Sequence, residues 1–453
     1  MIVARSFVRR WIQSWAAWLG LAVGVLWAVP CFAQGSAAPA GGYVDLGKAS
    51  VTGGDRWPFA HGAWKTGNGL TPGDPQLKKL QDLLVNDLQL SGYFRWISDG
   101  TYGENAQAAP VADNEIDFVP WRTLGAQYLI KATVQREGDH YTVELRLHNV
   151  LEGHQLLGRK YEVPQSQLAP VVHDFANRVL EVTTGKMGAF GTRIVFCSTR
   201  AGHLKDIYVV DSDGSNLTRL TLDGRIAMLP RWSPSGASIL YTSYQNYRPE
   251  IWVQDAATGH RNVVATGGLN TGGAFSPDGN RIAYSKDGNI CVMNVDGSGS
   301  HALTSGDALD VSPSWSPDGS KIVFISDRAG RPHVYVMNSD GSGQRKISSM
   351  SMDHGSPKFS PDGQQIAFEA NPGPWRIYVM AADGSGVRKV TDGPGSDEHP
   401  SWSPDGRTLV YSSGGSGSSS LFLVSALGGT PFRLTDGRAS DQQPDWGPMP
   451  KTP

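Results

Sequence analysis

Cysteine is scarce in this chain of 453 residues, which holds only Cys31, Cys197 and Cys291. Neither the cysteine spacing nor the histidine spacing fits a zinc-binding pattern. Cys197 and Cys291 lie in apolar runs typical of strands, so we expect both to be buried as small hydrophobic side chains without a disulfide. A chain of this length can bury enough apolar surface to fold without a disulfide or zinc framework.

Charged residues are also few, at 18% of the chain, and the formal net charge is −2. No basic stripe is present to neutralise phosphates, which argues against nucleic acid as a partner. The G-x-S-x-G sequence of hydrolase domains is missing as well. Glycine (55 residues) and proline (28) are abundant, together with 14 Trp and 14 Tyr. This composition predicts many short strands and tight turns.

Long apolar runs are absent except at the N-terminus. Three arginines precede the apolar run from Trp15 to Val29, and small residues follow it up to Ala33. This order predicts an export signal over residues 1–33 that is cleaved after Ala33. The alternative is an uncleaved membrane anchor, because Trp11 to Pro30 is nearly long enough to span a bilayer. Residues 34–55 are Gly-rich and poor in apolar anchors, so we expect a flexible arm there.

Residues 56–187 combine helical and strand patterns. Four leucines recur at helical spacing before Gly92, and residues 127–150 alternate with period two around a Gly-Asp turn, which predicts a helix and a β-hairpin. Residues 156–164 add a strand. Residues 166–185 predict a second helix, whose expected apolar face is formed by Leu168, Val171, Val172, Phe175, Val179 and Val182. We therefore expect a small α/β domain with its helices packed on one sheet.

From residue 188 to residue 448 a short phrase recurs: RWSPSG, AFSPDG, SWSPDG, KFSPDG and SWSPDG. Its aromatic residue falls at Trp232, Phe275, Trp315, Phe359 and Trp402, with a degenerate sixth copy at Trp446, and successive gaps are 43, 40, 44, 43 and 44 residues. A fixed period of this length, with four β runs in each unit, predicts a β-propeller. Residues 449–453 would be a short tail.

The two ends of the repeat region are out of phase. TRIVFCS (192–198) begins a unit without the recurring phrase, and QQPDWGP (442–448) begins one without completing it. Together they make one blade, so we expect six blades in a closed ring with no free edge. In SPDG, proline sets φ at the second turn position and glycine supplies a positive φ. The phrase is thus interpreted as the turn after each inner strand, with its aromatic packed between blades.

Function in a propeller tends to lie on the loops at one end of the channel. The residue five positions before each aromatic should lie on that rim, and Glu398 and His399 add polar groups to it. These side chains could hold calcium and a hydrolytic water, line a protein-docking funnel, or cap loop backbones. The six rim residues are Ala227, Asn270, Asp310, His354, Asp397 and Asp441.

Three stretches outside the propeller phrases carry a resemblance to a known family. They are LVNDLQLSGYF (84–94), the run from FVPWRTLGAQYLIK to HQLLGRKY (118–161) and GAFGTRIVFCS (188–198). With the export signal and the SPDG repeats, the chain resembles the TolB family, periplasmic components of the Tol–Pal system, over most of residues 75–447.

The resemblance implies a non-enzymatic periplasmic adaptor without a cofactor, which supports outer-membrane integrity and envelope constriction during cell division. The channel mouth would receive the outer-membrane lipoprotein Pal. The arm at residues 34–55 would be taken up by the inner-membrane protein TolA, although its sequence lacks the apolar, proline-containing run expected there. The candidate Pal contacts are Asn270, Thr271, Gly272, Asp310, Val311, Ser312, His354, Asp397, Glu398, His399 and Asp441.

Two other function classes compete with the adaptor. A calcium-dependent, lactonase-like propeller hydrolase would use the Asp and His residues of the rim. A carbohydrate- or peptidoglycan-binding propeller would use the many tryptophans. Thermal stabilisation by calcium would favour the first class, and sugar binding would favour the second.

Overall fold

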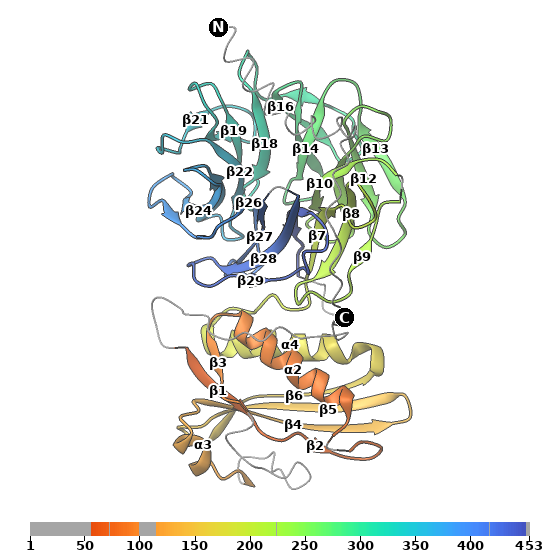
Figure 1. Cartoon of the computed structure of the whole chain (residues 1–453), viewed down its shortest axis with the longest axis vertical. Helices are drawn as coiled ribbons and strands as arrows, with labels where there is room; N and C mark the ends of the chain where they lie inside the picture. The colour runs from red at the N-terminus through yellow and green to blue at the C-terminus, as the bar shows by residue number, and fades with distance from the viewer. Residues whose placement is uncertain (1–55, 72, 99–114, 223, 416, 450–453) are drawn as a thin grey trace, which may run out of the picture. The chain divides into compact units, whose positions relative to one another are not determined.

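The computed structural model of this chain describes residues 56–71, 73–98, 115–222, 224–415 and 417–449. The described residues belong to one compact unit and form one six-stranded sheet with helices, followed by six four-stranded sheets (Figure 1). The predicted signal (1–33) and arm (34–55) lie outside the described residues. No helix within the described ranges combines the length and apolar character needed to cross a membrane.

The N-terminal α/β domain contains one mixed sheet in the order β3-β1-β4-β5-β6, with β2 pairing to β4. Helices α2 and α4 pack against each other, and their apolar faces join side chains of the sheet in one core. The elements are β1 (Trp57–His61), β2 (Lys65–Thr66), α2 (Pro75–Leu90), β3 (Phe94–Trp96), α3 (Val119–Thr123), β4 (Tyr128–Glu137), β5 (His140–Asn149), β6 (His154–Pro164), the 3-10 helix η5 (Gln165–Gln167) and α4 (Leu168–Thr184).

Local sequence explains where these elements begin and end. Asp74 caps α2 by accepting a hydrogen bond from the Gln76 backbone N–H at 2.8 Å, and Pro75 occupies the first helical turn. The β4–β5 hairpin turns at Gly138, whose φ is +66°. The predicted helices, hairpin and third strand are confirmed. One expectation is wrong: Val182 is 45% exposed, because it lies in the last turn of α4 beyond the edge of the core.

The propeller has six blades of four antiparallel strands, here called A to F, arranged round a common centre (Figure 1). Blade A is β30 (Asp441–Trp446), β7 (Arg193–Ser198), β8 (Asp206–Asp211) and β9 (Thr218–Arg219). Blade B is β10 (Ala227–Trp232), β11 (Ser238–Ser243), β12 (Glu250–Asp255) and β13 (Arg261–Ala265). Blade C is β14 (Asn270–Phe275), β15 (Arg281–Lys286), β16 (Asn289–Asn294) and β17 (His301–Ala302).

Blades D to F repeat the same order from the innermost to the outermost strand. Blade D is β18 (Asp310–Trp315), β19 (Lys321–Ser326), β20 (His333–Asn338) and β21 (Arg345–Lys346). Blade E is β22 (His354–Phe359), β23 (Gln365–Ala370), β24 (Arg376–Ala381) and β25 (Arg388–Lys389). Blade F is β26 (Ser396–Trp402), β27 (Thr408–Gly415), β28 (Ser418–Ser425) and β29 (Phe432–Arg433).

Blade A closes the ring from both ends of the repeat region. Strand β30 pairs with β7 in antiparallel register, with Asp441 opposite Ser198 and Trp446 opposite Ile194. The predicted six-bladed fold and its mode of closure are confirmed. Cys197 and Cys291 are buried and neither forms a disulfide, as the sequence predicts.

The SPDG phrase forms the turn between the first two strands of a blade, as predicted. In blade D the Gly319 φ is +69°, and Trp315 donates its indole N–H to the Ala274 carbonyl of blade C at 3.2 Å. Ser316 accepts a hydrogen bond from the Lys321 N–H at 2.9 Å, and Asp318 accepts one from the Ser320 N–H at 3.0 Å. The Ser and Asp of the phrase therefore satisfy turn N–H groups, while the aromatic joins neighbouring blades.

Ring closure generates the first testable prediction. A chain ending at Ser440 lacks β30, so β7 loses its partner and becomes an open inner edge. We expect its cooperative thermal unfolding transition, followed by circular dichroism, to move down by at least roughly 10 °C or to vanish. A chain ending at Met449 keeps β30 and serves as the control. An unchanged transition in the shorter chain would show that closure is not needed.

Candidate functional site

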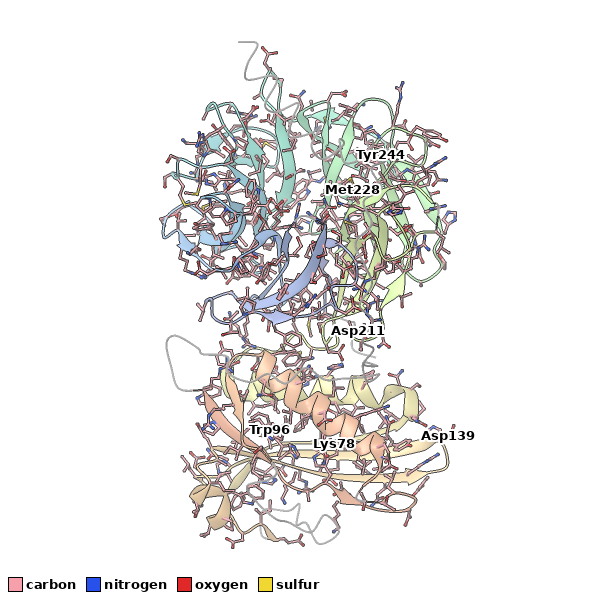
Figure 2. The ribbon with its side chains drawn as sticks, viewed as in Figure 1. Lys78, Trp96, Asp139, Asp211, Met228 and Tyr244 are labelled. Atoms are coloured by element: carbon pink, nitrogen blue, oxygen red, sulfur yellow. The ribbon has the colours of Figure 1, made fainter. Side chains whose placement is uncertain are left out.

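The six predicted rim residues lie at one end of the propeller, where the innermost strands begin; we call this end the mouth. Five of them are the first residue of an inner strand, and Asp397 is the second residue of β26. Tyr244, whose N–H donates to the Ile226 carbonyl just before β10, lies at this end of the propeller, and Asp211 lies at the other (Figure 2). All six rim side chains are buried, with 0–3% exposure.

Each rim aspartate forms an ion pair: Asp441 and Asp310 pair within their own blades, whereas Asp397 of blade F pairs with Arg376 of the preceding blade E. Asp441 accepts from Arg200 at 2.6 Å and from the Ser198 hydroxyl at 2.6 Å. Asp310 pairs with Arg328 at 2.8 Å, and Asp397 lies 3.4 Å from Arg376. The network of these ion pairs comprises Ser198, Arg200, Asp310, Arg328, Arg376, Asp397 and Asp441. These pairs fasten the start of an inner strand to the strands and loops behind it, because a buried carboxylate needs a charged or hydrogen-bonding partner.

The two rim residues with uncharged polar side chains are also engaged, His354 of blade E by side chains of the preceding blade D and Asn270 by the loop that leads into its strand. His354 lies 3.2 Å from His333 and 3.1 Å from the Ser348 hydroxyl, measured at its Nδ1. Burial, then His333, lowers the pKa of His354 to about 3, so its imidazole is neutral near pH 7. Asn270 donates its side-chain amide to the Gly267 carbonyl at 3.1 Å. These side chains hold loop backbones at the mouth.

The rim side chains do not converge on a common point, as a calcium site would require. Within the described ranges no group of three or more His, Cys, Asp or Glu side chains is placed to hold a metal ion. Of the other predicted contacts, His399 is buried, whereas Glu398 has a 31% exposed side chain and Thr271, Gly272, Val311 and Ser312 are partly exposed. The partly exposed residues are therefore those that a docking partner could touch directly.

Every inner strand carries a bulge two residues after the rim position, which the sequence analysis did not identify. The bulged residue adopts a left-handed conformation in all six blades, with φ between +47° and +58°: Leu229, Gly272, Ser312, Ser356, His399 and Gln443. The pairing with the second strand shifts register at the same place in each blade. The sequence does contain a sign of the bulges, because the residue after the bulge is proline in five of the six strands. Proline has no N–H to donate to the hydrogen bonds between strands and is found at bulges.

Two residues beyond the bulge, charged side chains meet in the channel. The ammonium of Lys358 on blade E bonds the Asp445 carboxylate of blade A at 2.7 Å. Blade F separates these blades in the ring, so the bond crosses the channel. Asp445 also accepts from the Trp232 N–H at 2.8 Å and lies 3.8 Å from the Nε of Arg231 on blade B. We call Arg231, Lys358 and Asp445 the channel triad.

A second set of titratable groups lies nearer the mouth. The Glu369 carboxylate accepts from the His399 backbone N–H and, at 3.1 Å, from the Ser356 hydroxyl. Burial, reinforced by the Glu398 carboxylate, raises the pKa of Glu369 to about 8, and burial also raises the pKa of Glu398. Burial and the surrounding cations lower the pKa of His399 to about 3. Near pH 7, Glu369 is therefore mostly protonated and His399 is neutral.

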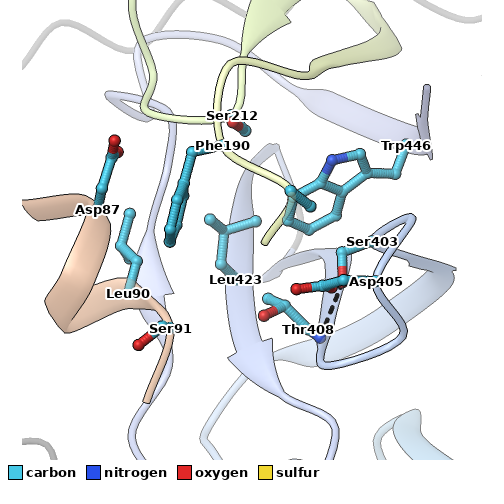
Figure 3. Close-up of a pocket in the computed structure, with 11 residues that line it drawn as sticks. Asp87, Leu90, Ser91, Phe190, Ser212, Ser403, Asp405, Thr408, Leu423 and Trp446 are labelled. Carbon is cyan, nitrogen blue, oxygen red and sulfur yellow. Dashed lines mark hydrogen bonds between the residues drawn. The ribbon is translucent and has the colours of Figure 1, made fainter. Parts of the chain in front are cut away.

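A separate hollow lies between the end of α2 and blades A and F (Figure 3). Its lining includes Asp87, Phe190 and Trp446. Asp87 accepts a hydrogen bond from His173 Nδ1 at 2.7 Å, and this carboxylate raises the pKa of His173 to about 9 against the opposing effect of burial. The pair is buried and joins α2 to α4, so we interpret it as structural.

Comparisons with known proteins add family and fold information. A family described as "TolB beta propeller domain" matches residues 180–449, and one described as "TolB amino-terminal domain" matches residues 62–156. A protein TolB homolog of Chlorobium chlorochromatii is 30% identical over 259 residues, which are 56% of this chain and 58% of the relative.

Two relatives carry the name Tol-Pal system protein TolB. That of Syntrophotalea carbinolica is 37% identical over 162 residues (36% of this chain, 37% of the relative). That of Anaeromyxobacter dehalogenans is 35% identical over 236 residues (51% of this chain, 53% of the relative). The chain thus matches between 37% and 58% of the length of these curated relatives. The crystal structure of TolB from Acinetobacter baumannii has the same fold, with a TM-score of 0.75 at 24% identity over 89% of this chain and 99% of that one.

The rim ion pairs predict a contrast between two carboxylates that bind the same arginine. Arg200 bonds buried Asp441 at 2.6 Å and Asp436, which is 44% exposed, at 2.7 Å. We expect Asp441→Asn to lower the free energy of unfolding by about 3 kcal/mol, because it removes the buried carboxylate that binds Arg200 and Ser198 and leaves Arg200 only the exposed Asp436. Asp436→Asn, the matched control, should cost less than about 1 kcal/mol. Urea denaturation measures both, and equal effects would contradict the structural role of Asp441.

The raised pKa of Glu369 predicts a pH dependence of stability. The carboxyl ordinarily ionises near 4.5 and in the folded protein near 8, so its contribution is fully present below about pH 4.5 and is lost as pH rises toward 8. We expect Glu369→Gln to lose less unfolding free energy than the wild type between about pH 5 and 8. Urea denaturation at several pH values in this range measures the free energy of unfolding of both proteins, and the two curves of free energy against pH are compared.

Glu162→Gln is the control for Glu369→Gln, because the Glu162 side chain is 71% exposed. Its curve should parallel that of the wild type. Parallel curves for Glu369→Gln as well would show that Glu369 is ionised in the folded protein.

Proposed function

The chain belongs to the TolB family, and on this basis we propose that it is a non-enzymatic periplasmic adaptor of the Tol–Pal system that binds the lipoprotein Pal at the propeller mouth. Through this contact it would support outer-membrane integrity and envelope constriction during cell division. The observation that carries the proposal is a ring of buried, paired strand starts at one end of the channel, followed on blades C and D by partly exposed residues. The Tol–Pal names of two relatives support the choice of system.

The proposed organisation follows the sequence pattern. Residues 1–33 would be removed on export, residues 34–55 would form an arm that TolA takes up, residues 56–187 would be the α/β domain and residues 188–448 the propeller. The signal and the arm lie outside the described residues. The arm therefore rests on the sequence and the family alone.

Buried ion pairs make the mouth suitable for docking. Because Asp310 and Asp441 hold their strands against an arginine of the same blade, and Asp397 against one of the preceding blade, the loops around them are fixed before a partner arrives. A preorganised surface loses little conformational entropy on binding, which raises affinity for a given contact area. These aspartates would act by positioning the mouth, and their own side chains would not touch the partner.

Exposed apolar side chains at the mouth provide surface that a docked partner could bury. Tyr247 is 77% exposed, and Arg225 stacks over its ring at 4.6 Å. Leu222 and Leu269, on the loops before β10 and β14, are also exposed. Together with partly exposed Thr271, they form an apolar and polar surface on blades B and C of the kind found at protein interfaces.

A hydrolase is not proposed for this mouth. The rim carboxylates that a calcium-dependent enzyme would use are each paired with an arginine of the same or the preceding blade, as far as the described residues reach. The arrangement holds backbone in place and leaves these oxygens no shared centre on which to bind an ion.

The proposal predicts which substitutions weaken Pal binding. Thr271→Arg and Glu398→Lys alter partly exposed positions at the mouth, and we expect each to weaken Pal binding at least tenfold in a titration with purified Pal. Thr218→Arg places the same new side chain on the outer strand β9 and should bind Pal like the wild type. Wild-type binding by both mouth variants would place the Pal contact elsewhere on the chain.

A further inference from the structure

The channel triad carries more positive charge than its own carboxylate can balance. Asp445 faces two cations, the ammonium of Lys358 at 2.7 Å and the guanidinium of Arg231 at 3.8 Å. The side chains of Lys358, Arg231 and Asp445 retain 14%, 13% and 10% exposure, so each is largely buried but still reaches solvent. Two cations on one carboxylate leave an excess of one positive charge at this level of the channel.

Both cations have unused hydrogen-bond donors. Within the described residues, the Arg231 guanidinium makes one hydrogen bond, from Nη1 to the Pro230 carbonyl at 2.9 Å, although it carries five N–H groups. The Lys358 ammonium makes one, to Asp445, although it carries three. Burial, followed by the neighbouring Arg231, lowers the pKa of Lys358 to about 8 even though Asp445 opposes the shift.

The groups nearer the mouth do not remove this excess. Besides the triad, the channel holds Lys205, Glu369 and Glu398, and Lys205 bonds the Gln442 side chain at 2.6 Å. Because Glu369 is mostly protonated near pH 7, three cations face two carboxylates in this part of the channel. His399 is neutral and adds no charge.

Small residues mark one side of the channel between the two cations. At the bulge, blades C and D present Gly272 and Ser312, whereas blades F, A and B present the larger His399, Gln443 and Leu229. At the level of the triad, blades C and D present Ala274 and Ser314, and blade F presents Ser401, whose hydroxyl bonds Asp445 at 3.3 Å. Arg231 on blade B and Lys358 on blade E therefore flank a pair of blades whose inward positions are small.

We propose that the channel triad is a carboxylate-binding site, entered from the mouth along blades C and D, in which Arg231 and Lys358 donate to the bound oxygens. A carboxylate fits because its single charge equals the excess on the protein. A phosphate carries about 1.5 to 2 negative charges, which exceeds the single positive charge in excess on the protein. The remaining negative charge would be repelled by Asp445 and Glu398. The planar fork of Arg231 suits two carboxylate oxygens at once.

The carboxylate could come from two sources, and the experiment separates them. Calorimetric titration of the mature protein uses acetate as the free carboxylate and the blocked tripeptide Ala-Asp-Ala as the peptide carboxylate. Ionic strength is held constant with chloride, and blocked Ala-Asn-Ala is the uncharged control. The peptide source rests on the proposed docking of a partner at the mouth, whereas the acetate source does not.

We expect saturable binding of at least one probe, weakened at least tenfold in Arg231→Gln and in Lys358→Gln. Arg231→Lys keeps the charge and should lose several-fold in affinity, because an ammonium cannot hold two oxygens in a fork. Arg231→Lys also keeps two cations beside Asp445, so this variant retains the charge balance of the triad. Arg438→Gln removes an arginine that is 80% exposed near Asp436 and should bind like the wild type.

Binding of acetate alone would assign the site to a free small carboxylate, and binding of the aspartate peptide would assign it to an acidic side chain of a partner. No saturable binding of either probe, or unchanged binding in Arg231→Gln, would overturn the inference. Pal binding is measured separately on the same proteins. Wild-type protein that binds Pal but neither probe would reject the carboxylate site and leave the proposed function standing.

Discussion

The antiparallel pairing of β30 with β7 is the contact on which the remainder of the propeller depends. It joins segments about 250 residues apart in the sequence and turns six sheets into a closed ring. Only in the closed ring do the six inner strands begin at one end and form a mouth. The same junction is held by Asp441, which bonds Ser198 and Arg200 across the two ends of the repeat region. Closure and the mouth are therefore stabilised by one local network.

Charge is used differently at successive depths of the channel. At the mouth, Asp310 and Asp441 are buried and paired with arginines of their own blades, so they stabilise loops and leave no free charge. Deeper in the channel, Lys358 reaches across to Asp445 while Arg231 stays only partly engaged. The first arrangement produces a rigid surface, and the second leaves donors available to an anion. Both arrangements follow from burial. An unpaired buried charge is energetically costly, and a paired buried charge forms strong hydrogen bonds of defined geometry.

The six bulges determine which side chains of the inner strands line the channel. A left-handed residue at the same place in each inner strand shifts the register, so that the following positions meet the channel at a new angle. Non-glycine residues adopt this conformation only where the surroundings enforce it, and Ser312, His399 and Gln443 do so here. Proline at the next position had marked five of the bulges in the sequence, but a proline alone does not reveal which way the neighbouring side chains turn.

The sequence by itself determined the α/β domain, the number of blades, the closure by both ends and the turn role of SPDG, because each rests on local periodicity or on a fixed repeat. It also placed Asp310 and His354 at one end of the propeller. It could not determine that these side chains are buried, since Arg328, the partner of Asp310, comes from a loop of the same blade, and His333, the partner of His354, comes from the preceding blade. Nor could it bring Lys358 to Asp445, 87 residues further along the chain. Those pairings depend on the curvature of the closed ring, which only the tertiary structure decides.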